Sequence, residues 1–379
     1  TFTETGELVQ HNKHPSSFLD DLWSITRKFV PHSYQVRQQT AALRQLDRSF
    51  GPHQLILDLD FAENFLHIQR NEPQAAHWNK GSTTLFIGIS KHLDAQAFFA
   101  TTGSIAQGTP ITVGGEYATV THDYHDQPDE LVHYSHSQVE NQEIQTHREN
   151  VRVRQVSTIA HVIVSDSKLH DTDFVQEAVR MIWMWLVCNN RNLAEQLTDL
   201  HIRSDGTSQH FKSKETLSSL LEIKRKFRLR RLTWCFRAPY HGKGAWDGIA
   251  AVVKQQLRRR LLADETTVVA SYMNLVGLLR EALCKKTNRP VIRAFDIMPL
   301  AKETIKCRRR RVPTIQMHED PTTGKKQGVR TLFSFAAGDN DELHARPLSC
   351  WCNNCLEGTS TACSFSNWDK QSMSVSSTT

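Results

Sequence analysis

The stretch His53–Gln69, HQLILDLDFAENFLHIQ, decides the fold because it predicts the first strand of the domain and holds its first candidate functional acids. Its leading half is rich in aliphatic residues, which favour a buried β-strand. Asp58 and Asp60 stand two residues apart, so both side chains should point to the same face. A carboxylate in a sheet needs a cation, a proton or a metal ion, and this stretch contains no Lys or Arg. We therefore expect a functional acid here; the alternative is a strand-end acid with a local basic partner.

The segments around this strand predict an α/β domain. Thr83–Ile89 repeats the β pattern after a Gly-containing loop and indicates a hairpin. Upstream, apolar residues recur at three- and four-residue steps between Phe18 and Phe50, and Pro31 interrupts them, so we expect two helices. Downstream, we expect strands at 156–164, 197–203 and 229–236, alternating with helices at 171–187, 212–227 and 245–262, and then a helix at 266–286 and an extended piece at 288–298.

Shifts in composition divide the chain into parts. Residues 92–155 are rich in Gly, His and acids without a sustained apolar period, which predicts an insertion after the second strand. The expected units are an N-terminal helical segment (1–50), a core (51–262), a helical and basic extension (263–340) and a Cys-containing, partly disordered tail (341–379). Residues 371–379 are the stretch expected to be disordered. Because the chain starts at Thr1 without a targeting segment, we expect it to be part of a longer product.

The net charge of +6 hides an uneven distribution. Residues 1–200 hold 15 Lys and Arg against 24 Asp and Glu, whereas residues 201–379 hold 31 against 16. Such an asymmetry predicts a polyanionic partner, for which nucleic acid is the natural choice. The longest uncharged apolar run, Met181–Cys188, is too short to span a bilayer, so we expect no membrane protein. Eight scattered cysteines favour a reducing compartment, the cytosol or nucleus.

Two further aspartates extend the candidate site. Asp205 follows an apolar strand in a Ser-Asp-Gly sequence, which taken alone is a turn signal. Asp247 lies near the start of a predicted helix, where it could simply complement the helix dipole. Together with Asp60 they come from a first strand, the end of a later strand and a following helix. Three carboxylates placed in this way can hold two divalent cations for phosphodiester cleavage.

The helix that follows Asp247 carries a basic stripe. Lys254 and Arg258 come seven and eleven residues later, close to whole numbers of helical turns, so they share its face. A cationic stripe that leads away from a metal-binding acid suits a phosphate backbone entering the site. The alternative is a solvated basic helix.

Five blocks of the sequence resemble one known family, the DDE/D transposases of eukaryotic DNA transposons. They cover roughly residues 50–262 and are Asp60–Asn64 (DFAEN), His77–Asn79 (HWN), Ser165–Asp166 with His170–Asp171, Ser204–Gln209 (SDGTSQ) and His241–Gly248 (HGKGAWDG). The resemblance implies a ribonuclease-H-like fold, a mixed β-sheet flanked by helices. It also implies that Asp60, Asp205 and Asp247 are catalytic and bind two Mg²⁺ or Mn²⁺ ions. The third acid is Asp where many relatives have Glu, and the insertion departs from the compact pattern.

The resemblance also implies a set of residues near the site and a set of partners. His241 and Lys243 would contact the scissile phosphate or the DNA, Glu63 belongs to the first block, and Asp58 is a reserve candidate for Asp60. The expected partners are transposon ends and target DNA, bound by a homo-oligomer in the nucleus. The leading hypothesis is DNA strand cleavage and strand transfer. The alternatives are a domesticated DNA-binding protein without catalysis and a cellular nuclease of the same fold.

Four cysteines near the C-terminus suggest a second metal. Cys350, Cys352, Cys355 and Cys363 lie in a loop-like segment, and such a cluster can hold a tetrahedral zinc ion. The spacing is irregular, so free reduced thiols are the alternative, and His344 could replace one ligand. The basic runs 224–231 and 308–311 suit either phosphate binding or nuclear import.

Overall fold

The computed structural model describes the backbone of most of the chain. The described residues are 14–67, 81–93, 111–113, 116–121, 152–154, 156–239, 244–263, 269, 271–284, 294–306, 314–317, 328–338, 342–357, 363 and 371–376. Within these ranges, none of the helices has the length and apolar character needed to span a membrane.

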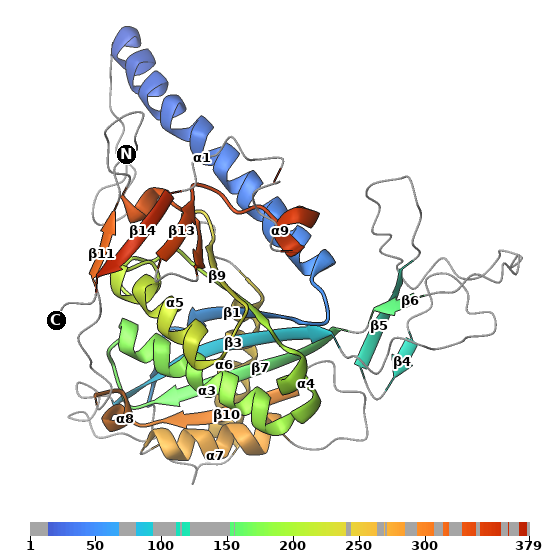
Figure 1. Ribbon diagram of the computed structural model, residues 1–379. Coiled ribbons are helices and arrows are strands. Elements are labelled where there is room, and N and C mark those ends of the chain that lie inside the picture. Colours follow the sequence, from blue (N-terminus) through green and yellow to red (C-terminus); the bar gives the residue numbers. More distant parts are fainter. Residues whose placement is uncertain are drawn as a thin grey trace, which may run out of the picture.

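A central five-stranded unit forms the middle of the main sheet (Figure 1). Its strand order is β7-β3-β1-β8-β9. β1 pairs antiparallel with β3, β3 pairs antiparallel with β7, and β8 and β9 continue parallel to β1. The expected hairpin and the expected α/β class are therefore confirmed. The bounds are β1 Gln54–Phe61, β3 Ser82–Leu93, β7 Val156–Ser165, β8 Asp199–Ser204 and β9 Arg231–Phe236.

Strands from the C-terminal third widen this sheet on both sides. β10 (Ala294–Leu300) pairs parallel with β7, and β12 (Ser334–Ala337) pairs antiparallel with β9. Beyond β12 the order continues through β13 (Glu342–Arg346) and β14 (Gln371–Ser376) to β11 (Thr314–Met317). The short β2 (Phe65–Leu66) pairs with the start of β3. The extension and the tail expected from the sequence thus supply strands to the same sheet.

One stretch expected to be disordered is partly a strand. The Ser-rich composition after residue 370 predicted disorder, but β14 pairs with β13 on one side and β11 on the other. Two neighbouring strands satisfy the backbone donors and acceptors of the strand between them, which its own composition does not reveal.

The predicted insertion contains a small sheet of its own. β4 (Ile111–Val113), β5 (Glu116–Thr121) and β6 (Arg152–Arg154) pair in the order β4-β5-β6 and form no ladder with the main sheet (Figure 1). They lie in the chain between β3 and β7, where the sequence placed the insertion.

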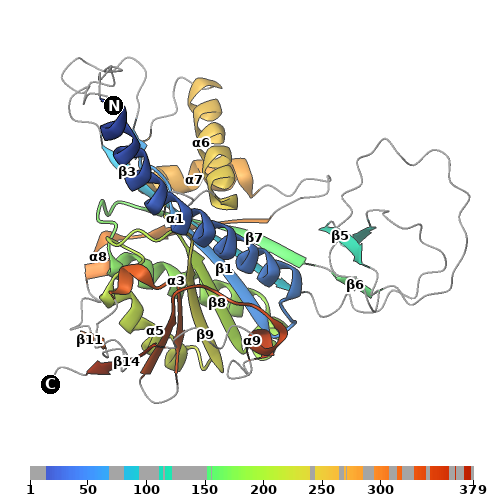
Figure 2. The same cartoon turned by 90° about the horizontal axis from the view of Figure 1, so that it is seen from above.

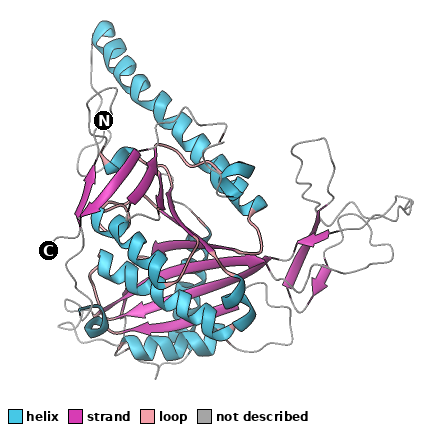
Figure 3. Cartoon of the chain, viewed as in Figure 1, coloured by secondary structure: helices cyan, strands magenta, loops and turns pink. Residues whose placement is uncertain are grey.

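Helices cover both faces of the main sheet (Figures 2 and 3). Leu55, Leu57 and Leu59 of β1 pack in one core with α3 (Thr172–Asn189) and α5 (Lys214–Lys226). The opposite face packs against α6 (Ala245–Ala263), α7 (Tyr272–Leu283) and the C-terminal half of α1 (Pro15–Ser49). Shorter helices are α4 (Arg191–Gln196), α8 (Lys302–Lys306), α9 (Asn353–Glu357) and the 3-10 helix η2 (Val329–Thr331).

A single long helix replaces the two helices expected before β1. α1 runs through Pro31 without a break. Proline removes one backbone hydrogen bond and costs about 3 kcal/mol in a helix interior. Pro31 is exposed, so water can satisfy the carbonyl that loses its partner. The expectation of two helices was wrong because a proline on the solvated side does not have to end a helix.

The reserve site residue Asp58 belongs to a buried ion pair. Arg203 of β8 lies opposite it in register and donates to both of its carboxylate oxygens at 2.6 Å. Arg203 also bonds Asp47 of α1, and the Lys91 ammonium lies 3.6 Å from Asp58. Asp58 thus has a structural partner from a neighbouring strand. The sequence argument was wrong on this residue because it looked for a cation only within the strand itself.

We expect this ion pair to dominate the stability of the sheet. Replacing Arg203 by Met leaves the buried Asp58 carboxylate with only the more distant Lys91 ammonium, and breaking a buried pair costs about 3–5 kcal/mol. Urea unfolding monitored by circular dichroism should show this loss. The matched control Lys226→Ala removes an exposed ion pair with Glu222 and should cost under about 1 kcal/mol. Equal effects of the two substitutions would contradict this account.

Candidate functional site

The three candidate carboxylates lie at one end of the parallel strand pair. Asp60 is the last residue but one of β1, and Asp205 directly follows β8. Because Leu59 pairs with Ser204, Asp60 and Asp205 lie next to each other in register at the same end of the strand pair. Asp247 stands in the first turn of α6, which packs on the sheet face that carries Asp60. The three elements therefore converge from positions far apart in the sequence.

Two of the carboxylates act electrostatically on the third, Asp60. Burial raises the pKa of Asp60 to about 7, and the negative charges of Asp205 and Asp247 add to this rise. Arg237 and a backbone hydrogen bond at Phe61 oppose it only in part. Among the described residues, the candidate ligands that all gather within 4.8 Å are cysteines and not these acids. The aspartates thus share one region of negative potential without the close packing of a preformed cage.

Local hydrogen bonds fix two of the three side chains. Asp205 accepts from the backbone N–H of Thr207 at 3.3 Å and from its hydroxyl. Asp247 accepts from the backbone N–H of Gly244 at 2.8 Å, which caps the start of α6. The turn and helix-start roles considered from the sequence are therefore real. These hydrogen bonds hold the two carboxylates in place at the end of the strands. A carboxylate has about four acceptor positions, so oxygen lone pairs remain for a cation.

A hollow of about 300 Å³ adjoins the acids. Asp60, Asp247, Trp246, Glu63 and Lys254 contribute to its lining. Lys254 donates to Glu63 at 2.9 Å, and Arg258 also lowers the pKa of the Glu63 carboxyl after the larger effects of Lys254. The structure therefore brings Glu63 and both basic residues of α6 to the candidate site.

The remaining near-site candidates do not join this group. Asp58 is held by Arg203 on the α1 side of the sheet. His241 and Lys243 lie outside the described residues.

A cluster of aromatic rings that the sequence analysis did not identify lies around Phe61, the residue after Asp60. The ring of Phe61 stacks on His170 at a centroid distance of 4.3 Å and meets His210 edge-on at 5.0 Å. His170 also lies 3.1 Å from the side-chain oxygen of Asn64. Burial lowers the pKa of His210 although the charge of Asp205 opposes this. The His-Asp and Ser-Gln-His sequences were the available signals, but only the fold shows that they meet.

A serine, histidine and aspartate also form a hydrogen-bonded series within the sheet. His161 bridges Ser90 at 2.9 Å and Asp296 at 3.2 Å. The three come from adjacent strands, and Ser90 and His161 have no exposed surface. A nucleophile has to reach its substrate, so this arrangement links β3, β7 and β10 and is no hydrolytic site.

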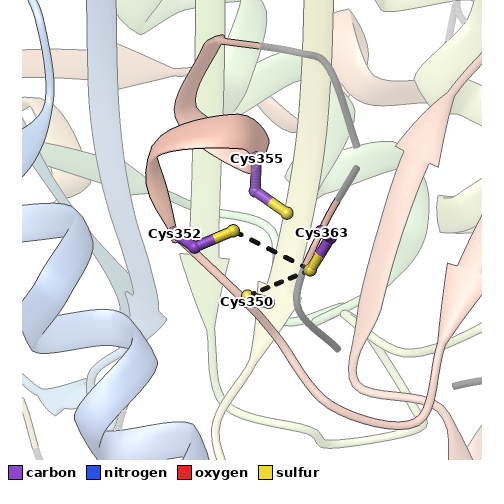
Figure 4. A group of neighbouring side chains, drawn as sticks. All are labelled: Cys350, Cys352, Cys355 and Cys363. Atoms are coloured by element: carbon purple, nitrogen blue, oxygen red, sulfur yellow. Dashed lines mark hydrogen bonds between the residues drawn. The ribbon is translucent and has the colours of Figure 1, made fainter. Parts of the chain in front are cut away.

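The four C-terminal cysteines form a compact cluster (Figure 4). All four sulfurs lie within 4.8 Å of one another, and Cys363 is 3.5 Å from Cys350 and 3.8 Å from Cys352. The cluster could hold a metal ion such as zinc, while His344 is not part of it. A hydrogen bond from Cys350 lowers the pKa of Cys355 to about 4. A smaller contribution comes from Arg346, which donates to the Cys355 sulfur at 3.3 Å. One thiolate is thus already favoured, which suits a cation.

The cluster sits on the sheet through backbone contacts. Arg231 of β9 donates to the carbonyls of Cys355 and Leu356, and Gln54 of β1 donates to that of Leu356 at 3.0 Å. Trp351 packs edge-on against His201 of β8 at 4.6 Å. The segment that carries the cysteines is therefore joined to three central strands.

Comparisons with known proteins give a family without an assigned activity. No curated protein and no solved structure matches the chain. One family, described as "Domain of unknown function (DUF8701)", matches residues 39–106 and 112–318. These ranges include all three site aspartates and end before the cysteine cluster. Because they cover more than half of its residues, the chain belongs to this DUF8701 family.

Proposed function

We propose that the chain is a metal-dependent enzyme that cleaves and transfers DNA strands, with a ribonuclease-H-like core of the DDE/D transposase type. The observation that carries the proposal is the convergence of Asp60, Asp205 and Asp247, close enough for the charges of the last two to raise the pKa of Asp60. The central strands support the proposed fold, because β1 pairs antiparallel with β3 on one side and parallel with β8 on the other. Asp60 lies on β1, Asp205 directly follows β8 and Asp247 lies in the first turn of α6. This is the order of a first strand, a later strand end and a following helix that the resemblance implies.

The donor set of the acidic site fits hard divalent cations. Carboxylate oxygens are the ligands that Mg²⁺ and Mn²⁺ prefer. Burial, and then the charges of Asp205 and Asp247, raise the pKa of Asp60, and a bound cation would oppose both effects. Two such ions, when bound, supply an activated water or 3′-hydroxyl and stabilise the leaving oxygen. Asp60 has to lose its proton first, whereas the fixed orientations of Asp205 and Asp247 limit reorganisation.

The proposed substrate is DNA because the residues around the acids are cationic on one side. Lys254 lines the hollow and Arg258 follows one turn later on α6. A phosphate backbone entering there would replace Glu63 as the partner of Lys254. Transposon ends, target DNA, a homo-oligomer and a nuclear location are parts of the same proposal.

For the cysteine cluster we propose a structural zinc ion. Four thiolates close the tetrahedral shell and leave no position for a substrate. The neighbouring Arg346 and the contacts of Arg231 and Gln54 indicate that the ion would hold the C-terminal segment against the central strands.

Catalysis and DNA binding should separate in variants. Asp205→Asn should reduce Mg²⁺- or Mn²⁺-dependent strand cleavage by about a thousandfold or more, because the amide does not hold the cation. DNA affinity, measured by fluorescence anisotropy, should stay equal or rise slightly. The control Glu215→Gln changes an exposed acid in α5 and should leave both unchanged. Binding without any cleavage by the wild-type protein would favour the non-catalytic alternative.

Neutralising the basic stripe should have the opposite effect. Lys254→Ala with Arg258→Ala should weaken binding to all DNA sequences and lower the salt slope by about one for each lost phosphate contact. Titrations at several salt concentrations measure this. An unchanged slope would show that α6 does not contact the backbone.

The acidic site should reduce stability at high pH when metal is removed. The folded-state pKa of Asp60 is raised from 3.8 to about 7, so stability falls as the pH rises through this window. Asp60→Asn should therefore stabilise the protein in EDTA at pH 8 by a few kcal/mol, since one pKa unit corresponds to about 1.4 kcal/mol. The gain should vanish near pH 4. Denaturant titrations at both pH values check this, and an equal gain at both would contradict the charge cluster.

Purified protein should contain one zinc ion per chain. Cys352→Ser should lower the zinc content and the melting temperature, because three thiolates hold the ion more weakly. The control Cys188→Ser removes an exposed thiol of α3 and should change neither. Elemental analysis and thermal unfolding measure both quantities; four freely alkylated thiols and no zinc would exclude the site.

A further inference from the structure

The residue that follows β9 brings a cation next to the candidate acids. The parallel ladders end in register on β1, β8 and β9, and the next residues on the three strands are Asp60, Asp205 and Arg237. The backbone N–H of Arg237 continues the ladder, because it donates to the carbonyl of Ser204 at 3.0 Å. Side chains in register on neighbouring strands point to the same face. Arg237 therefore shares the face of Asp60, with Asp205 between them.

Arg237 packs against the helix that carries the third acid. The central carbon of its guanidinium lies 4.7 Å from the ring centroid of Trp246, the residue before Asp247 in α6. Its Nε is buried without a hydrogen-bond partner, and no described carboxylate forms an ion pair with it. Burial lowers the pKa of Arg237, although nearby aspartates that include Asp247 oppose this effect. The side chain is only half-buried, so an anion can reach the five donors of its guanidinium.

The ion pairs beside Arg237 do not account for its charge. Asp47 and Asp58 are held by Arg203 and Lys91, so two acids already have two cations. The charge of Arg237 is an addition to this balanced cluster. It acts on the candidate site as well, where it opposes the raised pKa of the site carboxyl of β1. Arg237 thus belongs electrostatically to the acidic site as much as to the buried ion pairs.

The acids and the guanidinium attract opposite kinds of ligand. Carboxylates bind divalent cations, which a guanidinium repels, so Arg237 is not a further metal ligand. A phosphodiester unites the two, because its oxygens bind both a divalent cation and a guanidinium. Lys254 lines the hollow about two turns after Asp247 on α6. Cations from the end of β9 and from α6 therefore border the acids, which suits a phosphate backbone that passes over them.

We propose that Arg237, packed on Trp246, binds the non-bridging oxygens of the phosphodiester on which the acidic site acts. The inference rests on the proposed function and adds to it the residue that contacts the reacting phosphate. A planar guanidinium can donate to two phosphate oxygens at once, whereas an ammonium is a point charge. Trp246 is 1% exposed, so its ring is a fixed support that limits reorientation of the guanidinium. Donors fixed in this way stabilise the charge on the phosphoryl oxygens during in-line displacement.

Substitutions of Arg237 in the full chain test this assignment. Arg237→Gln removes the charge, Arg237→Lys keeps the charge but not the paired donors, and the control Lys28→Gln removes an exposed charge from α1. Two affinities are measured first. Fluorescence anisotropy gives the affinity for a short DNA duplex in EDTA, and isothermal titration calorimetry gives the affinity for Mn²⁺ alone. Mn²⁺-dependent strand cleavage is measured next, and circular dichroism checks that each variant is folded.

A phosphate contact affects the two affinities differently. Arg237→Gln should bind the duplex about tenfold more weakly, because a charge-assisted hydrogen bond is lost. Its affinity for Mn²⁺ should stay equal or rise, since a repelling charge is removed from the acids. Its cleavage rate should fall by about a hundredfold or more. Arg237→Lys should keep the DNA affinity within about threefold and cleave about tenfold more slowly, and Lys28→Gln should change none of these quantities.

Other outcomes overturn the assignment. If Arg237→Gln lowers the affinity for Mn²⁺, the residue positions the acids and does not contact phosphate. An unchanged DNA affinity of this variant excludes the contact, and so does unchanged cleavage. Should Arg237→Gln not fold, Arg237→Lys decides, because cleavage at the wild-type rate by that variant contradicts the paired donors. A wild-type chain that binds DNA without cutting it removes the proposed enzyme, whereas the two affinities still show whether Arg237 contacts phosphate.

Discussion

The buried guanidinium of Arg203 is the constraint on which the architecture depends. It lies in β8 and donates to both carboxylate oxygens of Asp58 in β1 through Nε and Nη2. Its Nη1 donates to Asp47 and to the carbonyl of Leu43 in α1. Nearby opposite charges overcome the effect of burial and raise its pKa further. A charge buried this deeply is tolerated only when every donor finds an acceptor. The pair therefore fixes the register of β1 and β8 and the position of α1 on them.

This register places the candidate site. Once Asp58 is opposite Arg203, Asp60 and Asp205 have to lie at the same end of the parallel strand pair. The ion pair holds Asp58, whereas for Asp60 the charge of Arg237 only partly offsets burial and the two neighbouring acids. The result is a carboxyl whose pKa lies near 7 beside two further acids. A carboxyl that is buried beside like charges is characteristic of functional sites, where stability is lower than the fold alone would permit.

The sheet face opposite α3 is assembled from distant parts of the chain. Gln39 of α1 bonds the carbonyl of Phe236 and the backbone N–H of Ser349, and Trp351 joins the core that α1 forms with Ile56. Trp351 lies between Cys350 and Cys352 of the cysteine cluster, whose segment is held by β1 and β9. A metal ion there would therefore act on the same packing that seats α1, which links the C-terminal segment to the stability of the central strands.

The sequence by itself determined the order of the elements and the α/β class. Apolar periodicity and turn residues are local signals, so β7, α3 and α6 could be predicted within a few residues, whereas the first strand was expected to run eight residues past the end of β1. The same holds for the basic stripe of α6, because helical spacing alone puts Lys254 and Arg258 on one face. The cysteines were identifiable by their density along the chain.

Only the tertiary structure decided which partners these residues meet. Asp58 and Asp60 look equivalent in the sequence, and the cation that separates their roles comes from a strand about 145 residues away. Pro31 stays within a helix because its side faces solvent, and β14 is a strand because two others border it. The gathering of four irregularly spaced thiols depends likewise on how the chain returns to the sheet. Long-range contacts of this kind carry no local signal, since they arise from packing between elements and not from the propensities within one.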